Sequence, residues 1–383
     1  FDELAIKRHA ELKGKIEVIP KSAAKNDEDL SIYYTPGVGA VSKELAKDPK
    51  KASELTIKSD MVAIISDGSA VLGLGNVGPE AAMPVMEGKA MLMKELAGIN
   101  AFPLCLDTQD TDEIISTVKN VAPVFAGINL EDIAAPKCFE IERRLHEELD
   151  IPVIHDDQHA TAIAVLAGLI NSIKIVGKDK SACRAVIIGA GAAGNGVAKL
   201  LHKWGIGDIT MIDSKGIIST EREDLDDSKK ELLAITNKSG LVGDLKLALK
   251  GADIVLGLSQ PGLLSAEDIS AMSKDAIVFA MANPIPEIYP DEAQRGGAKV
   301  VATGRSAFPN QINNVLVFPG MFKGAIESGA TFVTDDIKLR AAEKLAEVVK
   351  NPSPEKIIPG VFDDGVVEAL LLLGPGVELQ PLL

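Results

Sequence analysis

Pairs of acidic residues stand directly after two apolar stretches of the chain. Asp156 and Asp157 come just after the β-branched run 151–154, and Glu131 and Asp132 come just after an apolar stretch that ends at Ile128. In open α/β sheets, ligands bind beyond the carboxyl ends of parallel strands, so acids at two such ends can converge. Carboxylate oxygens suit Mg²⁺ or Mn²⁺. Glu131, Asp132 and Asp157 therefore indicate a divalent metal site; the alternative is that they cap the helices that follow.

A glycine-rich motif, Gly189-Ala190-Gly191-Ala192-Ala193-Gly194, follows an apolar strand and opens a helix. In that context the glycines allow a tight turn, close approach of a pyrophosphate and close helix packing, with the phosphate on the helix N-terminus. Asp213 closes the next strand about 20 residues further on, where an acid accepts hydrogen bonds from the adenosine ribose. Asp213 favours NAD, whereas Lys215 beside it could serve a 2′-phosphate, so NADP remains the alternative.

Alternating strands and helices would position these groups. This pattern predicts an α/β fold with two doubly wound parallel-sheet domains, of which the second is a Rossmann NAD(P)-binding domain. We expect the first domain over 1–156 and the second over 157–383. Strands are expected at 61–66, 101–106, 124–128, 151–154, 184–189, 209–212, 253–256, 276–280 and 299–302, and helices at 84–96, 111–121, 131–149, from 160 and at 194–204.

Other stretches carry weaker signals. Tyr34 lies in a Thr-Pro-Gly turn, which predicts a rigid loop before a helix that begins at Val38. The remaining expectations are a helix over 2–13, a loop over 14–31, a hairpin-like unit made by 61–66 and a second strand at 70–74, a solvated loop over 219–231, and a tail over 351–383 that packs back on the body.

Composition narrows the class of protein. The 383 residues carry a net charge of −15 and the pI is about 4.9, so no basic face is expected and nucleic acid is excluded as a partner. No apolar run reaches the roughly 18 residues that span a bilayer, and no signal-peptide core is visible. We therefore expect a cytoplasmic protein without a membrane partner. Cys105, Cys138 and Cys183 are too far apart to suggest a disulfide or a zinc site.

Seven motifs in unbroken order between about Ser31 and Gly320 resemble those of malic enzymes, in the short prokaryotic form without a fused phosphotransacetylase-like domain. These motifs are TyrTyrThrProGlyVal at 33–38, SerAspGlySerAlaValLeuGlyLeuGlyAsn at 66–76, ValMetGluGlyLys at 85–89, AsnLeuGluAsp at 129–132, IleHisAspAspGln at 154–158, PheAlaMetAlaAsnPro at 279–284 and AsnGlnIleAsnAsnValLeuValPheProGly at 310–320.

The resemblance implies oxidative decarboxylation of (S)-malate to pyruvate and CO₂ with reduction of NAD(P)⁺, and also decarboxylation of oxaloacetate. It implies Lys89 as general base, Tyr34 as general acid and Asp156 beside the lysine. The metal, Mg²⁺ or Mn²⁺, would be bound by the three acids named above. Asn283, Asn313 and Asn314 would contact substrate or nicotinamide, and a homodimer or a higher homo-oligomer is expected.

Two positions depart from the family pattern. Ala70 stands where many larger malic enzymes have an arginine that binds the substrate carboxylate, and Ala160 stands where glycine is more familiar. Two other functions remain open. One is malolactic conversion of malate to lactate with retained NAD, and the other is a non-catalytic dinucleotide-binding regulator. The regulator would need neither Lys89 nor the carboxylates.

Overall fold

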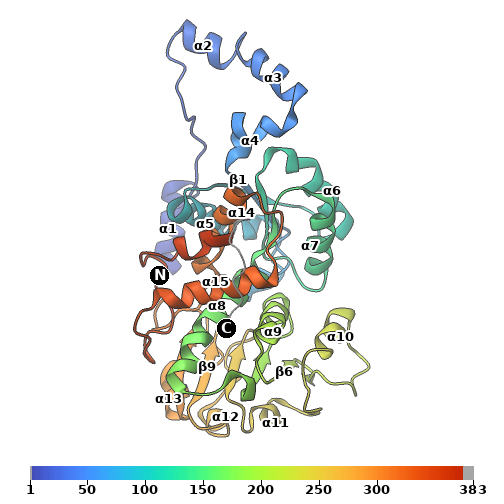
Figure 1. Ribbon diagram of the computed structural model, residues 1–383, viewed down its shortest axis with the longest axis vertical. Helices are drawn as coiled ribbons and strands as arrows, with labels where there is room; N and C mark the ends of the chain where they lie inside the picture. The colour runs from blue at the N-terminus through green and yellow to red at the C-terminus, as the bar shows by residue number, and fades with distance from the viewer. Residues whose placement is uncertain (1, 374–383) are drawn as a thin grey trace.

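Two separate β-sheets, one from each half of the chain, lie along the long axis of the molecule (Figure 1). The computed structural model describes residues 2–373, without the side chain of Leu72. The four-stranded first sheet has the order β2-β1-β3-β4, and its strands are all parallel. It comprises β1 (Met61–Ser66), β2 (Asn100–Cys105), β3 (Gly127–Leu130) and β4 (Val153–His155), with crossover helices α5 (Pro79–Ala97), α6 (Thr111–Val121) and α7 (Lys137–Glu148).

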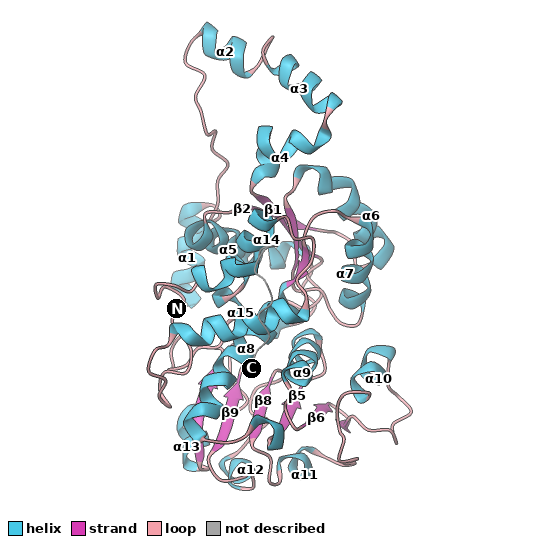
Figure 2. Cartoon of the chain, viewed as in Figure 1, coloured by secondary structure: helices cyan, strands magenta, loops and turns pink. Residues whose placement is uncertain are grey.

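The second sheet has six strands in the order β10-β9-β8-β5-β6-β7, parallel except for β7 (Figure 2). The chain leaves β5 toward β6 and later returns to β8 on the other side, which makes the β5–β8 edge a topological switch point. The two parallel sheets expected from the sequence are confirmed. The strands of the second sheet are β5 (Arg184–Ile188), β6 (Asp208–Asp213), β7 (Gly216–Ile217), β8 (Ile254–Gly257), β9 (Ala276–Ala280) and β10 (Ala298–Thr303). The helices of this half are α9 (Ala192–Trp204), α10 (Asp227–Leu233), α11 (Leu245–Leu249), α12 (Ala266–Ser270) and α13 (Pro290–Arg295).

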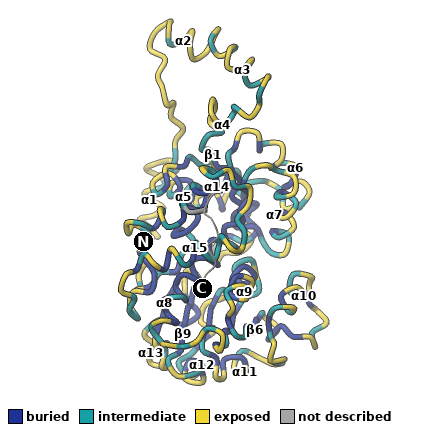
Figure 3. Tube along the Cα trace, in the orientation of Figure 1, coloured by how far each residue is buried: buried dark blue, intermediate teal, exposed yellow. Residues whose placement is uncertain are grey.

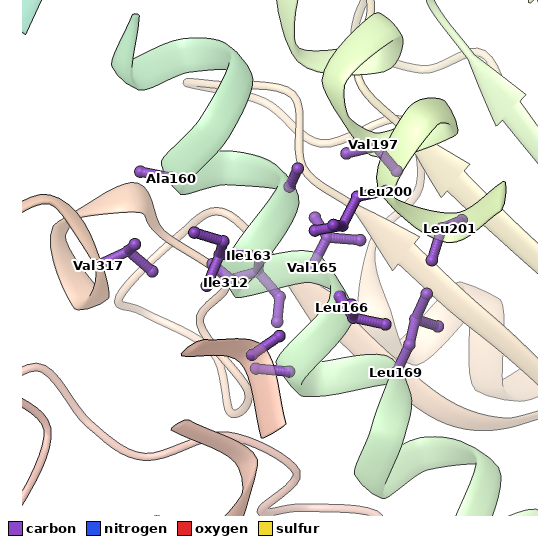
Figure 4. Close-up of a cluster of buried hydrophobic side chains, with 14 of the residues drawn as sticks. Ala160, Ile163, Val165, Leu166, Leu169, Val197, Leu200, Leu201, Ile312 and Val317 are labelled. Carbon is purple, nitrogen blue, oxygen red and sulfur yellow. The ribbon is translucent and has the colours of Figure 1, made fainter. Parts of the chain in front are cut away.

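Helix α8 (Asp156–Val176) joins the two halves and lies in the largest hydrophobic core. Its apolar side chains, among them Ile163 and Leu166, pack against α9 and against Ile312 and Val317 (Figure 4). The expectation that no stretch is long and apolar enough to span a bilayer is wrong, because α8, with 21 residues, is long and apolar enough by length and composition. Within that stretch 67% is buried in the protein, which is the environment of a core helix.

The C-terminal part of the described chain returns to the first sheet. Helix α14 (Phe318–Ser328) brings the Phe322 ring within 3.4 Å of where a Cβ on Gly127 of β3 would lie. Helix α15 (Asp335–Val348) packs along α8, and the short helix η7 (Glu368–Leu373) packs on α14. The tail expected over 351–383 is therefore seen as far as 373, and 374–383 lie outside the described residues.

An N-terminal arm stands away from the body. The segment after α1 (Asp2–Leu12) contacts the body, where the Lys15 N–H donates to Glu87 of α5 at 3.0 Å, whereas the arm formed by α2 (Asp27–Tyr33) and α3 (Val38–Lys47) projects beyond the first sheet (Figure 1). None of the residues in α2 or α3 is buried, as the yellow and teal trace in Figure 3 shows. The prediction of a loop over 14–31 is therefore wrong for its last residues. Asn26 accepts a hydrogen bond from the Asp29 N–H, and this N-cap starts α2.

Several other local expectations were wrong. Residues 70–74 form no strand: β1 pairs in parallel with β2 and β3, and Val71 and Gly75 make only an isolated bridge. Helix α5 begins at Pro79, which suits the first helical position, and Pro84 lies inside the helix. Helix α7 begins at Lys137 and not at 131, so 131–136 remain a loop. The charged stretch 219–231 ends in α10.

Candidate active site

Lys89 lies at the centre of the candidate site, on the buried side of α5, with 8% of its side chain exposed. Its ammonium donates to Asp156 Oδ2 and lies 2.9 Å from Glu131 Oε2. The ring of Phe318 lies below it, with the centroid 4.3 Å from Nζ. Asn314 Nδ2 donates to the same oxygen of Asp156 at 2.6 Å. Residues of α5, of α8, of the loop after β3, and of α14 and the segment before it thus meet around one ammonium group.

The three predicted metal ligands converge beside Lys89. Glu131, Asp132 and Asp157 each offer a carboxylate oxygen, and these oxygens all lie within 4.8 Å of one another. Asp157 is in the first turn of α8, and its Oδ2 accepts a hydrogen bond from the backbone N–H of Asp132 at 3.0 Å. Asp132 has a φ of 52°, a left-handed conformation that a non-glycine residue rarely adopts. Such strain is common at functional sites.

The electrostatics of this cluster suit an added cation. Burial raises the pKa of Glu131 well above its ordinary value; Lys89 opposes the rise, while Asp157 and Asp156 add to it. Burial alone would lower the pKa of Lys89, but Asp156, Glu131 and Asp157 outweigh burial and raise it. Asp156, Glu131 and Asp157 thus all act on one buried ammonium, and Asp132 lies beside them. Hard oxygen donors with surplus negative charge fit Mg²⁺ or Mn²⁺.

The turn after β1 holds the loop that carries Glu131 and Asp132. Asp67 accepts hydrogen bonds from the backbone N–H and the hydroxyl of Ser69, at 2.9 and 2.6 Å. Ser69 Oγ in turn accepts the Ala134 N–H at 2.9 Å, and the Ala70 N–H donates to the Asp132 carbonyl at 2.9 Å. The sequence analysis missed this positioning role of Ser69, although the residue lies inside the quoted 66–76 motif. Ala70 therefore holds the Asp132 loop through its backbone N–H.

Asn313 and Asn314 have different roles in the structure. Asn313 Oδ1 accepts the Val315 N–H at 3.0 Å and so caps the short helix η6 (Asn314–Leu316). Only Asn314 contacts the Lys89–Asp156 group. Asn283 lies at the carboxyl end of β9, and a Cβ on Gly73 would lie 2.0 Å from its carbonyl oxygen. The glycine-rich loop after β1 therefore packs directly against the Asn283 loop of the second half.

Tyr34 is not among the groups that the single chain brings together. It follows the last residue of α2 on the projecting arm, and 67% of it is exposed. Figure 1 shows the arm standing away from α5, which carries Lys89.

The glycine-rich motif has the geometry of a phosphate-binding turn. Gly189 has a φ of +113°, and a Cβ there would lie 2.5 Å from the Leu258 carbonyl oxygen. A Cβ on Gly194 would lie 1.9 Å from the Gly189 carbonyl oxygen, so α9 could not pack so closely with another residue. A Cβ on Gly191 would meet nothing within 4 Å, which leaves room for a pyrophosphate at the N-terminus of α9.

Asp213 is paired with cations that the sequence analysis did not identify. Its carboxylate accepts hydrogen bonds from Arg222 at 2.7 and 3.1 Å and from Lys229 at 2.9 Å. Burial alone would raise the pKa of Asp213, but these hydrogen bonds lower it to about 2. Lys215 instead pairs with Asp224. The two cations come from the stretch that was expected to be a solvated loop, and only their positive charge in the sequence hinted at them.

Comparison with known proteins identifies both halves of the chain. The family model described as "Malic enzyme, N-terminal domain" matches 13–146, and the one described as "Malic enzyme, NAD binding domain" matches 158–363. The NAD-dependent malic enzyme of Geobacillus stearothermophilus is 53% identical over 93% of this chain and 74% of its own length. The bifunctional malic/malolactic enzyme of Bacillus subtilis is 49% identical over 96% of this chain and 90% of its own.

The solved structures agree with the family models. The crystal structure of the NAD-dependent malic enzyme from Thermotoga maritima superposes with a TM-score of 0.94 at 46% identity, covering 97% of this chain and 99% of that one. The second half of the chain is therefore an NAD(P)-binding domain, as the glycine-rich motif predicted.

Proposed function

We propose that this chain, which belongs to the malic enzyme family, catalyses the oxidative decarboxylation of malate to pyruvate and CO₂ with reduction of NAD(P)⁺ and with a divalent metal. The single observation that carries the chemistry is the buried Lys89 ammonium beside Asp156 and the Glu131–Asp132–Asp157 cluster. A regulator that only binds a dinucleotide would have no use for a buried lysine among four carboxylates.

Lys89 would accept the proton of the malate hydroxyl as hydride leaves for the nicotinamide. A Mg²⁺ or Mn²⁺ ion bound by Glu131, Asp132 and Asp157 would polarise the substrate oxygens, stabilise the enolate and offset the carboxylate charge that raises the pKa of Lys89. Asp156 holds the lysine in place by its direct hydrogen bond. General-base catalysis of this kind contributes about 10²–10⁴ in rate.

Tyr34 would protonate enolpyruvate at C3 from the arm of a second copy of this chain. The tyrosine is exposed on an arm that stands away from Lys89, so one chain does not complete the site. The same arm exposes Leu30, Ile32 and Val41, and exposed apolar side chains gathered on one segment are typical of protein interfaces. A homodimer that exchanges arms would cover these side chains and supply the acid.

The nicotinamide would lie near Asn283 and Asn314, where the two halves of the chain meet, and the adenosine ribose near Asp213. We assign residues 1–156 to substrate and metal binding and 157–383 to the dinucleotide. In support, the family models meet between 146 and 158, and Asp156 opens the helix that joins the two sheets. NAD is the proposed preferred cofactor because Asp213 accepts hydrogen bonds; NADP is the competitor because Arg222 and Lys229 lie beside it.

Malolactic conversion is a second candidate, since a relative at 49% identity is named as a bifunctional malic/malolactic enzyme. One assay separates the two: malate is offered with NAD or NADP and Mn²⁺, and both reduced nicotinamide and the organic acid product are measured. Pyruvate with stoichiometric reduced nicotinamide supports the proposed reaction. Lactate without net formation of reduced nicotinamide would show the malolactic reaction. If neither cofactor gave any product, the chain would instead be a non-catalytic dinucleotide-binding regulator.

A further inference from the structure

Glu142 of α7 is buried behind the acidic cluster and accepts three hydrogen bonds. Its Oε1 accepts the backbone N–H of His155 at 2.7 Å and His159 Nε2 at 2.9 Å, and its Oε2 accepts Gln158 Nε2 at 3.0 Å. Burial alone would raise the pKa of Glu142, but His159 and the hydrogen bond from the His155 backbone N–H hold it well below its ordinary value. Glu142 is therefore a carboxylate, which can only accept hydrogen bonds.

The charge of Glu142 fixes the orientation of Gln158. Because the carboxylate needs donors, the amide nitrogen and not the amide oxygen of Gln158 must face it. The same nitrogen lies 3.0 Å from His155 Nδ1, so its second hydrogen is directed at that ring nitrogen. Nδ1 must then accept, and a neutral imidazole that accepts at Nδ1 carries its proton on Nε2.

The Nε2 of His155 faces a predicted metal ligand. It lies 3.5 Å from Asp157 Oδ2 and has no hydrogen-bond partner within residues 2–373. The backbone N–H of Asp132 donates to the same oxygen at 3.0 Å. The Asp132 N–H therefore holds Oδ2, and the Nε2–H of His155 faces the same oxygen from 3.5 Å without forming a hydrogen bond. With the other tautomer, a ring lone pair would face the carboxylate and repel it.

We infer that Glu142 is a positioning residue for the metal site, acting through Gln158 on the tautomer of His155 and through His155 on the orientation of Asp157. This inference rests on the metal proposed above at Glu131, Asp132 and Asp157. Groups that orient metal ligands in this way typically change metal affinity by about 10–100-fold when they are replaced.

The test is the dissociation constant for Mn²⁺, measured without substrate from the electron paramagnetic resonance signal of free Mn²⁺. Glu142→Gln keeps the size of the side chain but turns an amide N–H toward one of the donors, so the constant should rise about 10–100-fold. Asn171→Ala is the matched control. Asn171 is buried on α8 and donates to the carbonyls of Ala346 and Ile357, away from the cluster. The Asn171→Ala variant should have a lower unfolding temperature but unchanged Mn²⁺ binding.

Gln158→Met tests the same relay if Glu142→Gln does not fold, because it keeps the side-chain length and removes both donors. Nitrogen-15 NMR of the five histidines should show His155 protonated at Nε2 in wild type and a mixture of tautomers in this variant, with metal absent. Substitution of His155 assigns its signals.

Three results would overturn the inference: an unchanged His155 tautomer in Gln158→Met, an unchanged Mn²⁺ constant in both variants, or an equal loss in Asn171→Ala. A wild-type protein that binds no Mn²⁺ would instead remove the metal site itself, and the inference with it.

Discussion

Two carboxylate sites of the chain differ in their charge balance. Around Lys89, the carboxylates of Asp156, Glu131 and Asp157 act on one ammonium, and burial raises the pKa of Glu131. At Asp213, Arg222 and Lys229 both pair with the carboxylate and its pKa is lowered to about 2, while Arg222 also pairs with Asp224. The first site lacks positive charge that a bound cation can supply. The second supplies its own cations, so a ligand there must compete with pairs that already exist.

This difference separates what each site can select. A site with surplus negative charge requires a cation and is expected to lose activity without one. A site with internal pairs tolerates either a hydroxyl or a phosphate, because the ribose 2′-OH can donate to the carboxylate and a 2′-phosphate can accept from the cations. We therefore expect large effects from changes near Lys89 and smaller, selective effects near Asp213.

The largest effect is expected from Lys89→Ala. Without the base, malate oxidation and the reverse reduction of added oxaloacetate by NAD(P)H should both fall, by about 10²–10⁴. Lys94→Ala is the control, since Lys94 lies on the same helix but is exposed. Steady-state rates in both directions measure the effect. Oxaloacetate reduction at the wild-type rate in Lys89→Ala would show that another group is the base.

Tyr34→Phe should slow overall turnover by about 10²–10⁴ and spare oxaloacetate reduction, because the acid acts only after CO₂ leaves. Tyr33→Phe, one residue earlier and similarly exposed, should change neither rate. Mixing Tyr34→Phe with Lys89→Ala tests the exchanged arm: mixed dimers would carry one complete site, so malate turnover should reappear. Failure of the mixture to gain activity, with subunit exchange verified, would contradict an acid supplied by the second copy.

Asp157→Asn should weaken Mn²⁺ binding by more than about 100-fold, since loss of a direct ligand exceeds the 10–100-fold typical of the groups that orient ligands. The metal-free variant should unfold at nearly the wild-type temperature, because 28% of the side chain is exposed and its loss relieves repulsion in the cluster. Calorimetry without metal measures this. A large drop in the unfolding temperature would mean that Asp157 mainly caps α8.

The smallest effect is expected at the ribose site. Arg222→Ala should lower kcat/KM for NADP relative to NAD by about tenfold, the order of one lost hydrogen bond to a charged group. Lys230→Ala, whose side chain pairs with Asp227 and not with Asp213, is the control. Wild type should prefer NAD. A wild-type preference for NADP above tenfold would show that the cations outweigh Asp213.

The sequence predicted the parts of the molecule whose signal is local. Acids after apolar strands predicted the acidic cluster and three glycines before a helix predicted the phosphate turn, because the ends of parallel strands meet at one edge of a sheet. The helix predicted over 111–121 is found at those residues because its signal is also local: Asp110 caps it and its apolar spacing is regular.

Features that depend on distant partners were missed. The pairing of Asp213 with Arg222 and Lys229 joins a strand end to a charged stretch that has no apolar period of its own. The prediction of a hairpin with a second strand at 70–74 is wrong because β1 pairs in parallel with β2 and β3 and has both of its faces buried. The position of Tyr34 relative to Lys89 could not be predicted either. Its arm, α2 and α3, has no buried residues, so no local pattern indicates where it lies.

The most direct test of the account is turnover of malate with NAD before and after removal of divalent metal by EDTA. We predict that reduced nicotinamide formation stops in the chelator and returns when excess Mn²⁺ or Mg²⁺ is added, because the Glu131–Asp132–Asp157 cluster requires a cation to act. Full turnover in EDTA would contradict the metal site and, with it, the role of the surplus carboxylates around Lys89.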